Sequence, residues 1–203
     1  MSSVARARRG RPATASRDDV LRAARAQFIG GRRLDVTIIA RDLGLGRATI
    51  YRWFGSRDAL LAEVVAGELE ALVGRARSRV RQRGARGLLE VFDCVNRWIA
   101  GSTALRRFVE QERAAALRLL TASDGVVQSR SVACIAELIA AEAAAGRYDP
   151  PADPRTLAYA IVRLAEAFLY NDAVFGMRGD HVRLREVEAA LLGVPRAGSP
   201  RSR

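Results

Sequence analysis

The side chains best suited to bind another molecule in this sequence lie close together near its N-terminal end. One predicted short helix, over about residues 47–54, presents Arg47, Thr49, Tyr51, Arg52 and Trp53 outward. Arginine pairs with guanine edges, the threonine methyl contacts thymine, and aromatic and hydroxyl groups contact bases and phosphates. This helix is therefore predicted to read base edges in the major groove of DNA.

Few other side chains could support catalysis or bind a metal. All 34 basic side chains are arginine, which excludes the lysine-dependent sites of Walker-type phosphate loops, Schiff-base enzymes and protein kinases. Only His181 supplies an imidazole, and Cys94 and Cys134 are too few for a disulfide framework or a zinc site. We therefore expect no enzymatic activity, no metal site and no cofactor.

The positive charge is concentrated in the first quarter of the 203 residues. The net charge is +12, and residues 1–57 contain 13 arginines against four aspartates, whereas residues 58–203 contain 21 arginines against 18 acidic residues. This asymmetry indicates a small basic module that meets a polyanion. Charge alone leaves three readings open: a nucleic acid, an anionic membrane surface, or a solvated arginine-rich surface.

We expect a cytoplasmic protein. The arginine-rich N-terminus is not followed by the apolar stretch of a secretory signal, and no run of about 18 uncharged apolar residues offers a membrane span.

The apolar periodicity predicts an all-α fold. Ser16 and Asp19 match a capping box at the start of the first helix, and Ser56 caps a long one. Four segments are expected: a flexible basic arm (1–15), a DNA-binding domain (16–64), a helical ligand-binding and dimerisation domain (65–194) and a flexible tail (195–203).

The DNA-binding domain is predicted to contain a helix-turn-helix. Asp35 caps its first short helix, and the glycine turn 44–46 joins that helix to the second. The side chains placed to pack the two helices together are Ile39, Ala40, Leu45 and Ile50.

Residues 36–61 resemble the TetR family of bacterial transcriptional regulators. The matching features are Ile39-Ala40, the glycine turn, Thr49-Ile50-Tyr51, Phe54, and Ser56 followed by a basic residue, an acid and Ala-Leu-Leu. The resemblance implies an N-terminal DNA-binding domain, a larger helical domain that binds ligand and dimerises, and repression relieved by a small molecule. It also implies that Arg47, Ala48, Thr49, Tyr51 and Trp53 contact bases or nearby phosphates, and that Arg57 contacts the DNA backbone.

Two positions depart from the family pattern. Gly46 stands where many members have Ser or Thr, which removes a side-chain cap, and Ile38 replaces a commonly polar residue. In the second half, residues 163–172 and 177–188 resemble the QsdR-like branch, which is associated with control of quorum-signal lactone breakdown. That likeness implies lactones or related small amphipathic molecules as inducers.

The predicted ligand pocket involves aromatic residues and one amide of the C-terminal domain. The candidates are Phe92, Trp98, Phe108, Tyr159, Phe168 and Asn171, with Tyr170 as a further possibility. At helical spacing, aromatic residues are more often simple core, and that alternative stays open.

The last two helices carry more apolar surface than a monomer needs, which favours a symmetric dimer over a closed monomeric bundle. The sequence therefore predicts a homodimeric repressor that binds a palindromic DNA operator and is released by a small-molecule effector. Two alternatives remain: a ligand-independent DNA-binding regulator or activator, and a helical small-molecule carrier or enzyme.

Overall fold

The computed structural model describes residues 15–171 and 180–195, and within these ranges every regular element is helical. The helices are α1 (Arg17–Ile29), α2 (Val36–Asp42), α3 (Arg47–Phe54), α4 (Arg57–Arg79), α5 (Gly84–Ala100), α6 (Thr103–Gln111), α7 (Arg113–Thr121), α8 (Val126–Ala144), α9 (Pro154–Glu166), the π-helix η1 (Ala167–Asn171) and α10 (His181–Leu191). The all-α prediction is confirmed. Most of the predicted arm and tail lies outside the described residues.

The first three helices form a small domain around one apolar core. The predicted capping box is present at α1, where the amide of Asp19 donates to the Ser16 hydroxyl over 3.2 Å and the amide of Ser16 donates to the Asp19 carboxylate over 2.8 Å. Ile39 and Ile50 are each 1 % exposed, so α2 and α3 pack against each other as the apolar pattern predicts.

The turn between α2 and α3 depends on glycine. Gly44 has φ +63°, a conformation that costs little only without a Cβ. The amide of Leu45 then donates to the carbonyl of Ala40 over 2.8 Å, which folds the chain back against the end of α2. This geometry fixes the angle at which α3 leaves the turn.

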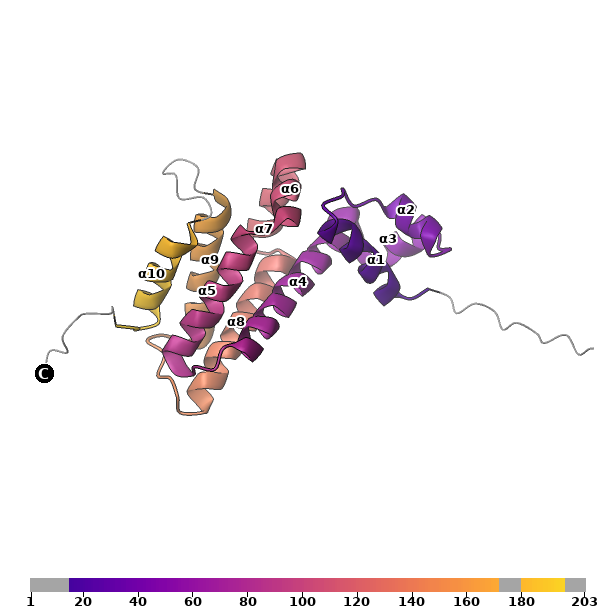
Figure 1. The fold of residues 1–203 in the computed structure, drawn as a ribbon. Helices are drawn as coiled ribbons and strands as arrows, with labels where there is room; N and C mark the ends of the chain where they lie inside the picture. The colour runs from indigo at the N-terminus through magenta and orange to yellow at the C-terminus, as the bar shows by residue number, and fades with distance from the viewer. Residues whose placement is uncertain (1–14, 172–179, 196–203) are drawn as a thin grey trace, which may run out of the picture.

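Helix α4 joins this domain to the rest of the molecule (Figure 1). Its first half packs on α1 and α3, and its second half packs between α5 and α8 in a second core that includes Val73, Phe92 and Ile139. The expected boundary between residues 64 and 65 therefore falls inside one continuous helix.

A buried carboxylate ties three helix ends together in the second domain. Glu142, which is 3 % exposed, accepts hydrogen bonds from Arg77 at the end of α4, from Arg147, and from the amide of Gly84 at the start of α5. The Arg147 hydrogen bonds are the main cause that lowers the pKa of Glu142 to about 2. Gly84 has φ +66°, and a Cβ there would lie 2.5 Å from the carbonyl oxygen of Arg147.

The helix after Pro154 changes character near its end. Asp153 caps α9 as predicted, but the α-helical pattern stops at Glu166 and continues as the π-helix η1. Single-turn π-helices are often found at functional sites. No described helix is long and apolar enough to cross a membrane.

Candidate functional site

Helix α3 presents a basic, aromatic surface on the outside of the small domain. Arg47, Ala48 and Arg52 are exposed, and Tyr51 is 41 % exposed. In the part of the chain that the structure describes, neither the Arg47 nor the Arg52 guanidinium has an ion-pair partner. Both groups are therefore available to bind phosphates or base edges.

Two predicted contact residues of α3 are only partly accessible. Thr49 is half-buried, and Trp53 packs against the domain core. Gly46, which departs from the family pattern, is the N-cap of α3 and provides no side-chain hydrogen bond to its first turn. The leading N–H groups of α3 consequently lack a side-chain acceptor.

Arg57 does not lie with the other predicted contact residues. Its Nε donates to the carbonyl of Leu34 over 2.9 Å, and its two Nη atoms donate to the carboxylate of Glu112 over 2.9 and 2.6 Å. The Arg57 side chain is 22 % exposed and that of Glu112 only 11 %. In this conformation, the Arg57 guanidinium is used inside the protein rather than offered to DNA.

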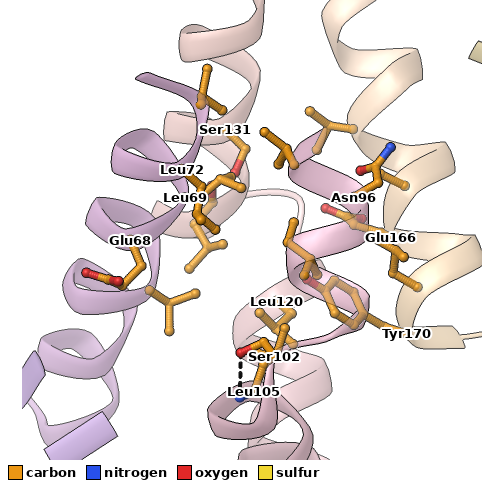
Figure 2. Close-up of a pocket in the computed structure, with 18 of the residues that line it drawn as sticks. Glu68, Leu69, Leu72, Asn96, Ser102, Leu105, Leu120, Ser131, Glu166 and Tyr170 are labelled. Carbon is orange, nitrogen blue, oxygen red and sulfur yellow. Dashed lines mark hydrogen bonds between the residues drawn. The ribbon is translucent and has the colours of Figure 1, made fainter. Parts of the chain in front are cut away.

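A cavity of about 130 Å³ lies mainly in the second domain, and Phe28 of α1 also lines it. The lining side chains come from α1, from α4 to α9, from η1 and from α10, and Figure 2 shows many of them. Most of the lining is apolar, and the exceptions include Asn96, Ser131, Glu166, Tyr170 and Glu188. A mostly apolar cavity with a few polar groups is typical of a site for a small organic molecule.

Glu188 is the most deeply buried of these polar side chains, at 0 % exposure. Its Oε1 accepts a hydrogen bond from Asn96 Nδ2 over 2.9 Å, while its Oε2 has no hydrogen-bond partner in the described structure. Burial raises the pKa of Glu188 to about 7; the Asn96 hydrogen bond opposes that shift in part.

Glu166 lies on α9 and is 6 % exposed. Its Oε2 is 2.8 Å from an Nη atom of Arg163, one helical turn earlier. Burial raises the pKa of Glu166 to about 7, against the opposing charge of Arg163. Both carboxyl groups are therefore close to the midpoint between their neutral and charged forms at neutral pH.

The structure brings only part of the predicted pocket together. Two of the candidates, Phe92 and Tyr170, line the cavity. Asn96, Glu166 and Glu188 also line it and were not predicted from the sequence. Glu188 could have been found, because it lies one turn after the buried Leu184 on the inner face of its helix.

The other predicted pocket residues lie elsewhere. Phe108 packs edge-on against Phe28 with ring centroids 6.2 Å apart, in the first core. Trp98 lies under the guanidinium of Arg79, and Tyr159 is 48 % exposed. Phe168 is half-buried but does not line the cavity. The side chain of Asn171 lies outside the described part of the structure.

The last two helices expose apolar side chains on their outer surface. Tyr159 on α9 is 48 % exposed, and Val182 and Val187 on α10 are 60 % and 36 % exposed. Together with the half-buried Leu191, they leave apolar area exposed on α9 and α10 in the described part of the structure.

Comparisons with protein families match nearly the whole described chain. Residues 20–64 match the model described as bacterial regulatory proteins, tetR family. Residues 83–193 match the model described as tetracyclin repressor-like, C-terminal domain. Comparison with curated protein sequences gives no match.

Solved structures of regulators share the fold. The transcriptional repressor QsdR of R. erythropolis is 30 % identical with a TM-score of 0.82, over 91 % of this chain and 97 % of that one. AlkX, a TetR family repressor from a Dietzia species implicated in biodegradation of n-alkanes, is 22 % identical with a TM-score of 0.62, over 89 % and 97 % of the two chains. Because AlkX is only 22 % identical, its similarity supports the fold alone. The similarity to QsdR, at 30 % identity, extends over both domains.

Proposed function

Because the chain belongs to the TetR family and is thus a DNA-binding transcriptional regulator, we propose that it is a homodimeric repressor that leaves its operator when a small molecule binds. It would act in the cytoplasm, where its DNA is, and have no catalytic role. The observation that carries the proposal is the combination of an exposed basic helix α3 in one domain with an apolar cavity in the other.

The proposed operator contacts come from α3. Arg47, Tyr51 and Arg52 project into solvent, where they can reach base edges and phosphates in a major groove. Ala48, Thr49 and Trp53, which project less far, would form the rest of the DNA-contacting surface. In a twofold dimer, two copies of α3 would enter successive major grooves of a palindromic site.

The proposed dimer forms through α9 and α10. Exposed Tyr159, Val182 and Val187 give these helices an apolar surface that a second copy can cover. A twofold interface uses the same patch on both subunits, so one such surface is sufficient.

The proposed release mechanism connects the cavity with Arg57. Cavity residues Ser102 and Leu105 lie at the start of α6, and Glu112 follows the last residue of that helix. A ligand that holds α6 in the position seen here would therefore keep the Arg57–Glu112 ion pair closed. Arg57 would contact the DNA backbone only when this pair is open, which makes the ion pair and DNA binding compete for one guanidinium.

The similarity to QsdR and the mostly apolar cavity support small amphipathic effectors, including lactones, as the class to test first. A ligand shifts the equilibrium only by the difference between its affinities for the two conformations. An effector must therefore bind the DNA-free conformation more tightly.

The experiment that tests this function is selection of genomic DNA fragments on the purified protein, followed by titration of the best fragment at several salt concentrations. We expect a palindromic consensus bound by one dimer, with affinity that falls steeply as salt increases. Binding without sequence preference would contradict the proposal. A small-molecule screen for release of the selected fragment separates it from a ligand-independent regulator, and turnover of any compound would favour an enzyme or carrier.

A further inference from the structure

The cavity of this arginine-rich protein has an acidic rather than a basic polar lining. Of the 34 arginines in the chain, none of those in the described residues lines the cavity, whereas Glu68, Glu166 and Glu188 do. A charged ligand group buried in such a place needs a partner of opposite sign, because transfer from water to an apolar interior is costly. The lining therefore offers partners to a cation and none to an anion.

Two of the three carboxylates already have arginine partners. Glu68 pairs with Arg25 on α1, and Figure 2 shows its carboxylate turned away from the other labelled side chains. Glu166 pairs with Arg163. These two groups are therefore the weaker candidates for binding a ligand.

Glu188 is different, because its buried Oε2 has neither a hydrogen bond nor an ion-pair partner in the described structure, whereas Oε2 of Glu166, which also has no hydrogen bond, lies 2.8 Å from Arg163. The neighbouring Arg185 has Nη2 2.6 Å from Glu90 and Nη1 3.3 Å from Asp93, and both its buried Nη1 and Oε2 of Glu188 have no hydrogen bond in the described structure. Buried polar groups of native proteins nearly always have a partner, so an orphan acceptor at a cavity wall points to a donor that arrives with a ligand.

From these observations, and resting on the proposed function, we propose that the cavity binds an amphiphile whose apolar chain ends in an uncharged or cationic N–H group, which donates to Oε2 of Glu188. The remaining lining, which includes Val73, Phe92, Ile135 and Ile161, would surround the apolar chain. The same lining has no charged partner for an amphiphile that ends in a carboxylate.

The Asn96 amide fixes which oxygen of Glu188 receives the ligand. Because Asn96 Nδ2 donates to Oε1, the carbonyl oxygen of a Glu188→Gln side chain would take the Oε1 position and its NH₂ group would take the Oε2 position. The substitution would thus convert the ligand-facing acceptor into a donor without a change in size. The substitution should make the site prefer an acceptor head group to an N–H donor, instead of abolishing binding.

The test uses four probes built on a chain of eight carbon atoms, which in octanoate includes the carboxyl carbon: N-octylacetamide, octylammonium, octyl acetate and octanoate. Binding is measured at pH 8, without DNA, by calorimetry and by the rise in Tm of the full chain. This pH lies above the pKa of Glu188, which burial raises to about 7, so the group is mainly an ionised acceptor. We expect the amide and the ammonium to bind at least tenfold more tightly than the ester, and octanoate not to bind.

Glu188→Gln should weaken the amide and the ammonium about tenfold and strengthen the ester. Glu186→Gln is the matched control, because Glu186 is exposed on the same helix, and it should keep the wild-type order. Octanoate binding as tightly as octylammonium, equal binding of ester and amide, or no binding of any probe would each overturn the inference. So would a Glu188→Gln protein that keeps the wild-type order.

These outcomes are separate from those of the operator experiment. If a different compound releases the operator while the amide and ammonium fail to bind, the head-group inference is wrong and the proposed function stands. If the probes bind in the expected order but no operator is found, the site is real and the repressor function is wrong.

Discussion

Arg57 and Glu112 form a bidentate ion pair that connects the DNA-binding domain with the second domain. Arg57 is the first residue of α4, and Glu112 is the single residue between α6 and α7. A second cation of the small domain, Arg33, also lies 3.5 Å from Glu112. The carboxylate of Glu112 is thus the point at which the junction of α6 and α7 holds the small domain.

Removal of this carboxylate should release Arg57 for DNA. In Glu112→Gln, the guanidinium loses its charged partner and becomes free to contact a phosphate. We expect operator affinity to rise a few-fold and the salt dependence to steepen by about one phosphate contact per subunit. Fluorescence anisotropy with labelled operator at several salt concentrations measures both.

Glu110→Gln is the control for this change, because Glu110 is exposed on α6 and has no ion pair in the described structure. It should leave affinity and salt slope unchanged. Unaltered binding by Glu112→Gln as well would show that Arg57 does not exchange between Glu112 and DNA.

Tyr51→Ala should weaken binding to the selected operator by ~1–3 kcal/mol, because it removes an exposed aromatic group from the proposed reading surface. Binding to unrelated DNA should change little. The matched control is Ile29→Ala, which truncates another exposed side chain of the same domain, at 48 % exposure. Full operator affinity in Tyr51→Ala would mean that α3 does not read the bases as proposed.

Val187→Asp should dissociate the proposed dimer, since it places a charge in the apolar surface of α10. Light scattering of the wild type should give twice the 22.1 kDa mass of one chain, and the variant should give the mass of one chain. Val126→Asp, at a position of α8 with similar exposure (37 % against 36 %), should remain dimeric. A dimeric Val187→Asp protein would require a different interface.

The buried carboxyl of Glu188 should make stability depend on pH. Its pKa is raised from 4.5 to about 7 by burial and by the charge of Asp93, against Asn96 and Arg185, so the folded protein keeps a proton that the unfolded chain releases between these values. The contribution of Glu188 to stability should therefore be greatest below pH 4.5, fall as pH rises to about 7, and then level off. Glu166 should contribute in the same direction.

In Glu188→Gln, the difference in Tm between pH 5 and pH 8 should shrink by about 4 °C, as measured by calorimetry without ligand. Glu186→Gln should retain the wild-type difference. An unchanged difference in Glu188→Gln would show that this carboxyl titrates normally in the folded protein.

The helix-turn-helix could be predicted because its determinants are local. Gly44 fixes the turn, and the apolar residues Ile39 and Ile50 lie at spacings that leave only one way to pack α2 on α3. The exposure of Arg47 and Tyr51 then follows from the position of the buried face. In the helix-turn-helix, the spacing of the apolar residues is therefore sufficient to predict which side chains are buried and which are exposed.

The cavity could be predicted only in part, because it depends on which helices meet. Phe92 and Trp98 have similar side chains on one helix, yet only Phe92 faces the cavity, while Trp98 packs under Arg79. The Arg57–Glu112 pair joins residues 55 positions apart, which no local pattern indicates. Contacts of this kind follow from the assembled fold.

The continuity of α4 has a mechanical consequence. Its 23 residues make a rod about 34 Å long at 1.5 Å per residue. If the end near Arg79 stayed in place, a tilt of about 10° would carry the end near Arg57 sideways by about 6 Å, nearly the 6.8 Å between base pairs two steps apart at ~3.4 Å each. A small change of angle inside the second domain would thus be enough to put the two reading helices of a dimer out of step with the helical repeat of DNA.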